Sequence, residues 1–155
     1  MSRAFVKESE DAAGDLELPE RAVSAHRNLV TPSGLAQIEG HLKRLDGEVA
    51  AARAAADKPV LARCQRDLRY WQQRRASAEL VVPGRTDGRV RFGSTVTIEL
   101  GDGSHRSFRL VGEDEADPAA GTIAYVAPIA AAMIGAELGE SVQTGAGGGE
   151  IIDIG

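Results

Sequence analysis

The residues best suited to chemistry in this 155-residue chain are the carboxylates of Glu113-Asp114-Glu115-Ala116-Asp117. Carboxylate oxygens are ligands that divalent cations prefer, but a metal loop also brings its ligands to one point, with a glycine at the sharp turn. The run shows no such spacing. We therefore expect a solvated loop here and not a metal site.

Other candidate chemical motifs are equally weak. The glycine-rich stretch Gly145-Ala146-Gly147-Gly148-Gly149 leads into an apolar run and has no lysine after it, so it predicts a mobile hairpin turn and not a phosphate loop. His26, His41 and His105 lie far apart, and no serine or cysteine has an evident base nearby. The sequence predicts no catalytic residue, no bound metal and no cofactor, and hence a protein that is not itself an enzyme.

The elements that would position any functional side chain begin with a helical hairpin over residues 31–82. Two successive segments carry apolar residues at alternating spacings of three and four, which is typical of a coiled-coil seam. The seam residues are Leu35, Ile38, Leu42, Leu45, Val49, Ala52 and Ala56, followed by Leu61, Cys64, Leu68, Trp71 and Ala78, with Arg75 where an apolar residue is due. Two such helices, each roughly 33 Å long, predict an antiparallel coiled-coil hairpin in which Cys64 and Trp71 are buried and the Tyr70 hydroxyl stays in water.

Capping residues mark the ends of these helices. Thr31 and Pro32 suit the start of the first helix, and Asp57-Lys58-Pro59 forms the tip and starts the second. Asp57 is better placed as a helix cap than as a metal ligand, because it is a single carboxylate beside a lysine.

Charge is divided unevenly along the chain, whose net charge is −5. Residues 31–82 carry nine basic and six acidic side chains, whereas residues 83–155 carry five basic and eleven acidic ones. This division and the 4% aromatic content disfavour a protein that wraps duplex DNA or stacks on bases, so we expect no sequence-specific nucleic-acid binding. The five arginines between Arg63 and Arg75 are either a solvated helix face or a surface that meets an acidic partner.

The flanking segments complete the organisation. Residues 1–30 have no apolar period and predict a mobile tail. Residues 81–88 form a linker, and residues 83–155 then show a period of two that predicts strands at 95–100, 106–110, 121–127, 142 and 150–154, with a short helix at 129–134 after Pro128. The fold class is therefore α+β, with a small antiparallel sheet and one helix. No secretory signal or run of ~20 apolar residues is present, so we expect a cytoplasmic protein without a membrane segment.

Five stretches resemble the bacterial Gre family of transcript-cleavage and elongation factors. They are residues 29–35, Gly88-Arg89-Val90-Arg91-Phe92-Gly93, residues 109–117, Ala127-Pro128-Ile129-Ala130, and Ile134-Gly135. The resemblance implies a C-terminal domain of the FK506-binding-protein-like fold over residues 83–155. It also implies a monomer that docks on RNA polymerase at the rim of the secondary channel and places its hairpin inside. Ala127, Pro128, Ile129, Asp114 and Asp117 are then the expected polymerase-binding residues.

The tip departs from the family pattern. Gre factors carry a segment of the type Gly-Asp-Leu-x-Glu-Asn-Ala-Glu-Tyr there, with an acidic pair that helps hold a catalytic metal ion, whereas this chain has Asp57, Lys58 and Pro59. The hairpin is also shorter, as in the regulator of nucleoside diphosphate kinase and the inhibitory anti-Gre factors. We expect a polymerase-binding regulator that does not stimulate transcript cleavage, with the direction of its effect on elongation left open.

Three alternatives stay open at this point. One is a cleavage factor with an altered tip, and another is a general protein-interaction module. The third is a prolyl isomerase, which would need an aromatic pocket built from Phe92, Phe108 and Tyr125.

Overall fold

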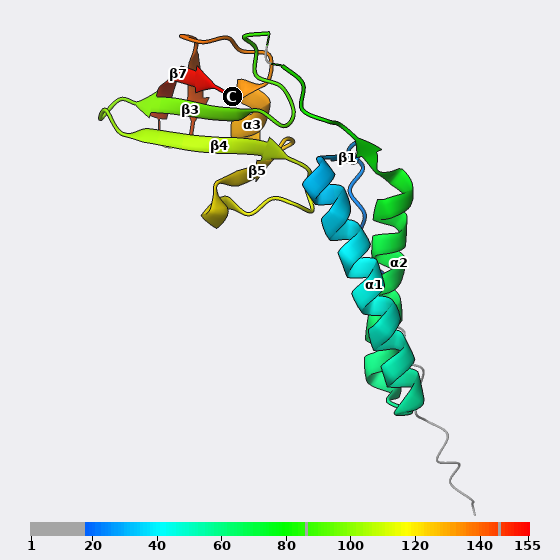
Figure 1. Ribbon diagram of the computed structural model, residues 1–155. Helices are drawn as coiled ribbons and strands as arrows, with labels where there is room; N and C mark the ends of the chain where they lie inside the picture. The colour runs from blue at the N-terminus through cyan, green and yellow to red at the C-terminus, as the bar shows by residue number, and fades with distance from the viewer. Residues whose placement is uncertain (1–17, 86, 146) are drawn as a thin grey trace, which may run out of the picture.

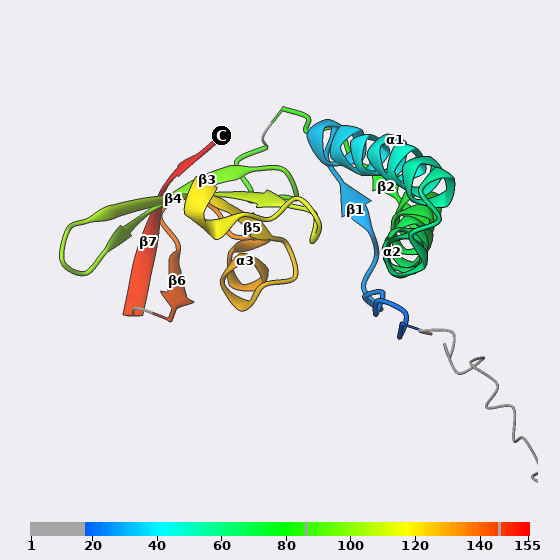
Figure 2. The same cartoon turned by 90° about the horizontal axis from the view of Figure 1, so that it is seen from below.

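The computed structural model describes residues 18–85, 87–145 and 147–155. A long helical hairpin projects from a five-stranded sheet domain (Figures 1 and 2). The elements in chain order are β1 (Leu29–Val30), α1 (Pro32–Ala54), α2 (Lys58–Ser77), β2 (Glu79–Leu80), β3 (Thr95–Leu100), β4 (His105–Val111), the 3-10 turn η1 (Pro118–Ala120), β5 (Thr122–Ala124), α3 (Pro128–Met133), β6 (Ser141–Thr144) and β7 (Gly147–Ile154). The α+β class is confirmed.

Both helices of the hairpin begin at the predicted caps. The Thr31 hydroxyl accepts a hydrogen bond from the backbone N–H of Gly34 at 3.0 Å, and the Asp57 carboxylate accepts one from Val60 at 3.1 Å. Each interaction satisfies a backbone donor that the first turn leaves unpaired. In each helix a proline stands in the first turn, where its missing N–H is no loss.

The interior of the hairpin follows the predicted apolar positions. Its buried residues include Ile38, Leu45, Val49, Cys64 and Trp71, with Leu35, Leu42, Leu61 and Leu68 packed partly buried against them. Burial raises the pKa of the Cys64 thiol, and the side chain packs in this core as the sequence predicts. The prediction for the seam is wrong at its end, where Ala56 is exposed in the turn.

The hairpin ends earlier than residue 82. Helix α2 stops at Ser77, and β2 pairs in parallel with β1, placing Leu29 opposite Glu79 and Val30 opposite Leu80. The backbone N–H of Glu79 donates to the Asn28 carbonyl at 2.8 Å. A second sheet of two strands therefore closes the base of the hairpin.

The expectation of a free tail is wrong for the described residues that precede α1. Asn28 and Val30 are almost fully buried, and Glu20 and Arg21 contact α2. Buried hydrogen bonds from Asn28 to α2 hold this segment, which a search for apolar periodicity cannot detect. Residues 1–17, which belong to the same predicted tail, lie outside the described part of the chain.

The C-terminal domain is a five-stranded sheet in the order β5-β4-β3-β7-β6. The predicted hairpin of β3 and β4 is confirmed, with Val96 opposite Phe108. Within this sheet the strand pairs are antiparallel except β4 with β5, which run parallel because the acidic loop and η1 carry the chain back across the sheet. The expectation of a glycine-rich turn is wrong for Gly147, Gly148 and Gly149, which are part of β7 and pair with β6.

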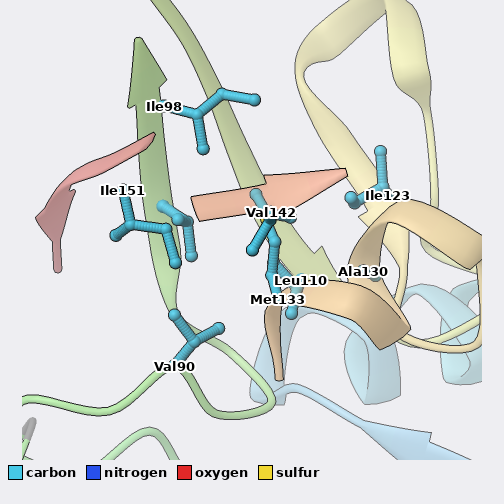
Figure 3. Close-up of a cluster of buried hydrophobic side chains, with 9 residues drawn as sticks. Val90, Ile98, Leu110, Ile123, Ala130, Met133, Val142 and Ile151 are labelled. Atoms are coloured by element: carbon cyan, nitrogen blue, oxygen red, sulfur yellow. The ribbon is translucent and has the colours of Figure 1, made fainter. Parts of the chain in front are cut away.

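One face of this sheet carries the core of the domain. Figure 3 shows the buried side chains meeting between the strands and α3; they are Val90, Val96, Ile98, Leu110, Ile123, Ala130, Met133, Val142 and Ile151. The predicted short helix is confirmed as α3, and Gly135 after it has a φ of +87°, a conformation that favours glycine. Among the described helices, none combines the length and the apolar run needed to cross a membrane.

Candidate functional site

The loop after β4 is bound to the base of the hairpin and is not solvated along its whole length. Its Asp114 carboxylate accepts a hydrogen bond from Arg74 Nε at 2.5 Å, and Arg74 Nη2 also donates to the Asn28 side-chain oxygen at 2.7 Å. Arg74 is 1% exposed, so its charge is fully removed from water. The expectation of a solvated acidic loop is wrong here, because a buried guanidinium requires a carboxylate partner.

Tyr70 joins the same contact, one turn before Arg74 on α2. Its hydroxyl donates to the second oxygen of Asp114 at 2.6 Å. Burial, and then the hydrogen bond to the carboxylate, raises the pKa of Tyr70 to about 12. The expectation that this hydroxyl faces water is therefore wrong.

The contact continues on the side of α1. Glu115 Oε2 accepts a hydrogen bond from the Thr31 hydroxyl at 2.6 Å, so the residue that caps α1 also binds the acidic loop. Gly112 lies so close to the hairpin that a Cβ there would stand 2.5 Å from the Leu29 carbonyl oxygen. We call this set of contacts the joint; it comprises Asn28, Thr31, Tyr70, Arg74, Gly112, Asp114 and Glu115.

A third carboxylate at the joint is poorly paired. Glu113 Oε2 lies 3.8 Å from Arg74 Nη2 and is buried without a hydrogen-bond partner among the described residues. Arg74 therefore lies between the carboxylates of Asp114 and Glu113, and acidic side chains are concentrated at the base of the hairpin. What the joint does show is a direct connection between the hairpin and the loop after β4, made through Arg74 and Thr31.

The tip of the hairpin places Asp57, Lys58 and Pro59 together in solvent. Asp57 uses one oxygen to cap α2, and no other carboxylate stands between Val49 and Arg66 in the sequence. Ala56 adopts a positive φ of 51° to make the turn. Within the described ranges, no group of three or more His, Cys, Asp or Glu side chains converges as a metal site would require.

The predicted docking residues fall into two places. Ala127, Pro128 and Ile129 form the start of α3, where Pro128 is exposed and Ile129 borders a cavity of about 350 Å³ beside Phe108. Asp117 is exposed and accepts a hydrogen bond from the Ala119 N–H at the start of η1. Asp114 lies apart from these residues, because both of its oxygens are engaged in the joint.

Sequence reasoning missed the residues that build the joint. It marked Arg75 as the polar residue on the apolar seam, whereas the buried arginine is its neighbour Arg74, and Arg75 pairs with Glu39 on the surface. A usable signal was present: an acidic run in one part and an arginine-rich helix in the other predict a contact by charge complementarity.

The aromatic residues of the C-terminal domain do not gather in one pocket. Phe92 borders a cavity of about 860 Å³ near the linker, whereas Phe108 borders the smaller cavity beside Ile129. Tyr125 meets the edge of Phe92 at 5.5 Å between ring centres, and its hydroxyl donates to the Arg27 carbonyl oxygen at 2.5 Å. This arrangement does not form the aromatic pocket that prolyl isomerisation would need.

Comparison with known proteins shows similarity to transcription elongation factors. Residues 85–154 match the family model described as "Transcription elongation factor, GreA/GreB, C-term". The chain is 47% identical over 66 residues to GreA of Legionella pneumophila (strain Corby), covering 42% of this chain and 41% of that protein. It is 39% identical over 74 residues to GreA of Cereibacter sphaeroides (strain ATCC 17023), covering 47% of this chain and 49% of the relative.

A solved structure also resembles the chain over a longer range. The GreA factor homolog 1 (Gfh1) of Thermus thermophilus superposes with a TM-score of 0.39 at 20% identity, covering 84% of this chain and 99% of the other. The curated relatives are matched over less than half of their own length. The family model matches residues 85–154, and this part of the chain is therefore similar to the C-terminal domain of the GreA/GreB transcription elongation factors.

Proposed function

We propose that the chain is an RNA polymerase-binding regulator of transcript elongation that does not stimulate transcript cleavage. The GreA/GreB-type domain at residues 85–154 is the observation that carries the proposal. The C-terminal domain, which we take to be of the FK506-binding-protein-like fold, docks at the rim of the secondary channel. The hairpin, which we take to be a coiled coil, enters the channel, and the protein acts as a monomer without sequence-specific contacts to nucleic acid.

The start of α3 is the proposed docking surface. Pro128 is exposed, and Ile129 is half-buried between the sheet core and the neighbouring cavity. An apolar residue at the rim of a small cavity is a typical anchor for a partner side chain. Asp117, which is exposed at the start of η1, is proposed as a separate charged contact with the polymerase, whereas Asp114 acts through the joint by holding the hairpin.

Through the joint, docking of the C-terminal domain sets the direction in which the hairpin points. Arg74, Tyr70 and Thr31 connect the hairpin to three consecutive residues of the acidic loop, Glu113 to Glu115. Because these contacts include a buried ion pair, bending at the joint would leave charge unpaired in a dry environment. The hairpin is therefore held in a defined direction when the C-terminal domain binds.

The tip explains why we expect no cleavage. Asp57 has one oxygen committed to capping α2, and Lys58 adds a positive charge at the neighbouring position. A divalent cation needs several oxygen ligands, and a single carboxylate beside a cation binds it weakly. The hairpin is about 34 Å long, because α1 has 23 residues that each rise ~1.5 Å. Its tip carries Asp57 and no second carboxylate.

Polymerase binding is tested by pull-down on core RNA polymerase. Pro128→Glu places a charge on the exposed docking surface at a helix start, where an acidic residue is compatible with folding. We expect it to weaken binding at least tenfold with a native circular dichroism spectrum, and Ile129→Asp to do the same. Leu138→Asp is the matched control, because Leu138 is an exposed apolar residue of the same domain, 62% exposed and outside the docking surface. Equal affinities for all these proteins would contradict the docking surface.

Cleavage is tested with a backtracked elongation complex, magnesium and the purified protein. We expect full-length transcripts to persist, and the protein to displace a cleavage-stimulating Gre factor in competition. Shortened transcripts that disappear with Asp57→Ala would instead identify a cleavage factor with an altered tip.

A further inference from the structure

A short segment before the hairpin covers one face of α2. Residues Glu20–His26, which we call the strap, come shortly before β1, and Glu20 and Arg21 contact this helix. The Glu20 carboxylate accepts a hydrogen bond from Arg69 Nε at 3.0 Å. The Arg21 guanidinium lies 3.8 Å from the centre of the Tyr70 ring and 3.6 Å from Asp67 Oδ1. The strap therefore covers the side chains of Arg69 and Tyr70 on α2.

The strap is held much less firmly than the residues that follow it. Asn28 and Thr31 are buried and belong to the joint, and Arg27 is anchored by the hydroxyl of Tyr125. The strap contacts are at the surface: the side chains of Glu20 and Arg69 are 58% and 50% exposed. Exposed ion pairs and cation–π contacts each change an equilibrium by less than about tenfold. The strap can therefore detach before Arg27 while the joint stays intact.

The covered face has the chemistry of an acid-binding surface. Helix α2 contains six basic side chains and one acidic side chain, Asp67. Of its arginines, Arg74 and Arg75 are paired with Asp114 and Glu39 from other elements, whereas Arg69 is paired with the strap. Arg66 contacts its neighbour Asp67 at 3.1 Å. Arg66, Arg69 and Tyr70 present two cations and an aromatic ring, and Glu20 already places a carboxylate on Arg69.

We propose that the α2 face formed by Arg66, Arg69 and Tyr70 is a docking surface for an acidic segment of RNA polymerase, and that the strap covers this face in the free protein. The inference rests on the proposed function, because it names the surface through which the hairpin meets its partner. In the free protein, Glu20 binds Arg69 at the place where a carboxylate of the partner would bind. The apparent affinity for the partner is lowered by the fraction of molecules in which the strap is closed.

The test uses the full chain with the double substitution Glu20→Gln and Arg21→Gln, which removes both charges that hold the strap. Trp71 is the chain's one tryptophan and lies 5.8 Å from the Arg21 guanidinium, so acrylamide quenching of its fluorescence reports strap opening without any partner. We expect the quenching constant to rise and the Kd for core RNA polymerase to fall about threefold to tenfold. Glu39→Gln is the matched control, because it removes an equally exposed Glu–Arg pair that does not involve the strap.

The outcomes separate this inference from the proposed function. Binding of core polymerase by the wild-type chain, with quenching raised but affinity unchanged in the double variant, would overturn the α2 docking surface and leave the proposed function standing. Unchanged quenching would overturn the strap as a cover. Failure of the wild-type chain to bind core polymerase would overturn the proposed function itself, and with it the docking surface. A gain in affinity for single-stranded RNA in place of polymerase would overturn the assignment of an acidic protein partner.

Discussion

The buried arginine of the joint allows a sharp comparison between two neighbouring residues of α2. Arg74 is 1% exposed and holds Asp114 at 2.5 Å, whereas Arg75 has a 48% exposed side chain and pairs with Glu39 at 3.1 Å. Methionine has nearly the length of arginine without its charge. Arg74→Met and Arg75→Met therefore remove the same group from adjacent positions that differ in burial.

The expected costs differ several-fold. Removing one partner of a buried ion pair costs about 3–5 kcal/mol, because the remaining charge stays buried without compensation. Here Arg74→Met leaves the carboxylates of Asp114 and Glu113 without their cation. Arg75→Met removes a surface pair and should cost less than about 1 kcal/mol. For a chain of this size, a loss of 3 kcal/mol lowers Tm by about 6–12 °C.

Urea unfolding followed by circular dichroism and by Trp71 fluorescence measures both variants. A third variant, Arg74→Met with Asp114→Leu, removes both charges of the pair and should recover part of the lost stability, because an apolar pair needs no counter-charge. The recovery is partial because Glu113 still lacks its cation and the Tyr70 hydroxyl loses its acceptor. Equal stability of Arg74→Met and Arg75→Met would refute the buried ion pair as the basis of the joint. Failure of the double variant to recover any stability would show that the uncompensated charge of Asp114 is not the source of the loss.

Two further predictions concern the hairpin. Leu45→Ala, at a position 2% exposed in the hairpin core, should cost about 2–5 kcal/mol in unfolding free energy, whereas Leu80→Ala at a 51% exposed position should stay within about 0.5 kcal/mol in the same urea titration. Tyr70 has an ordinary pKa of 10.0 that the folded protein raises to about 12, so its contribution to stability is complete below pH 10 and is lost as the pH rises through 12. Unfolding titrations between pH 9 and 12 should show this loss, with a smaller decline in Tyr70→Phe, and equal declines would contradict the Tyr70–Asp114 hydrogen bond.

Local sequence determined the elements of this protein. The alternating apolar spacing specified both helices, Thr31 and Asp57 their starting points, and the period of two the β3 and β4 strands. Helix caps and amphipathic faces depend on residues only a few positions apart, so they can be predicted from short stretches of sequence. The single carboxylate at the tip, on which the expectation of no cleavage depends, is likewise a property of sequence alone.

The tertiary structure decided how these elements are joined. Asp114 binds residues 40 and 44 positions earlier in the chain, and Glu115 binds Thr31 across 84 positions. Whether Arg74 or Arg75 is buried depends on where the acidic loop meets α2, and the parallel pairing of β5 depends on the path of that loop. The position of the strap is likewise a tertiary feature. Glu20 binds Arg69 and Arg21 lies over the Tyr70 ring, and residues 20–26 have no apolar periodicity that would predict these contacts. Long-range pairing is set by complementary charge and burial between distant segments, and only the folded chain brings those segments together.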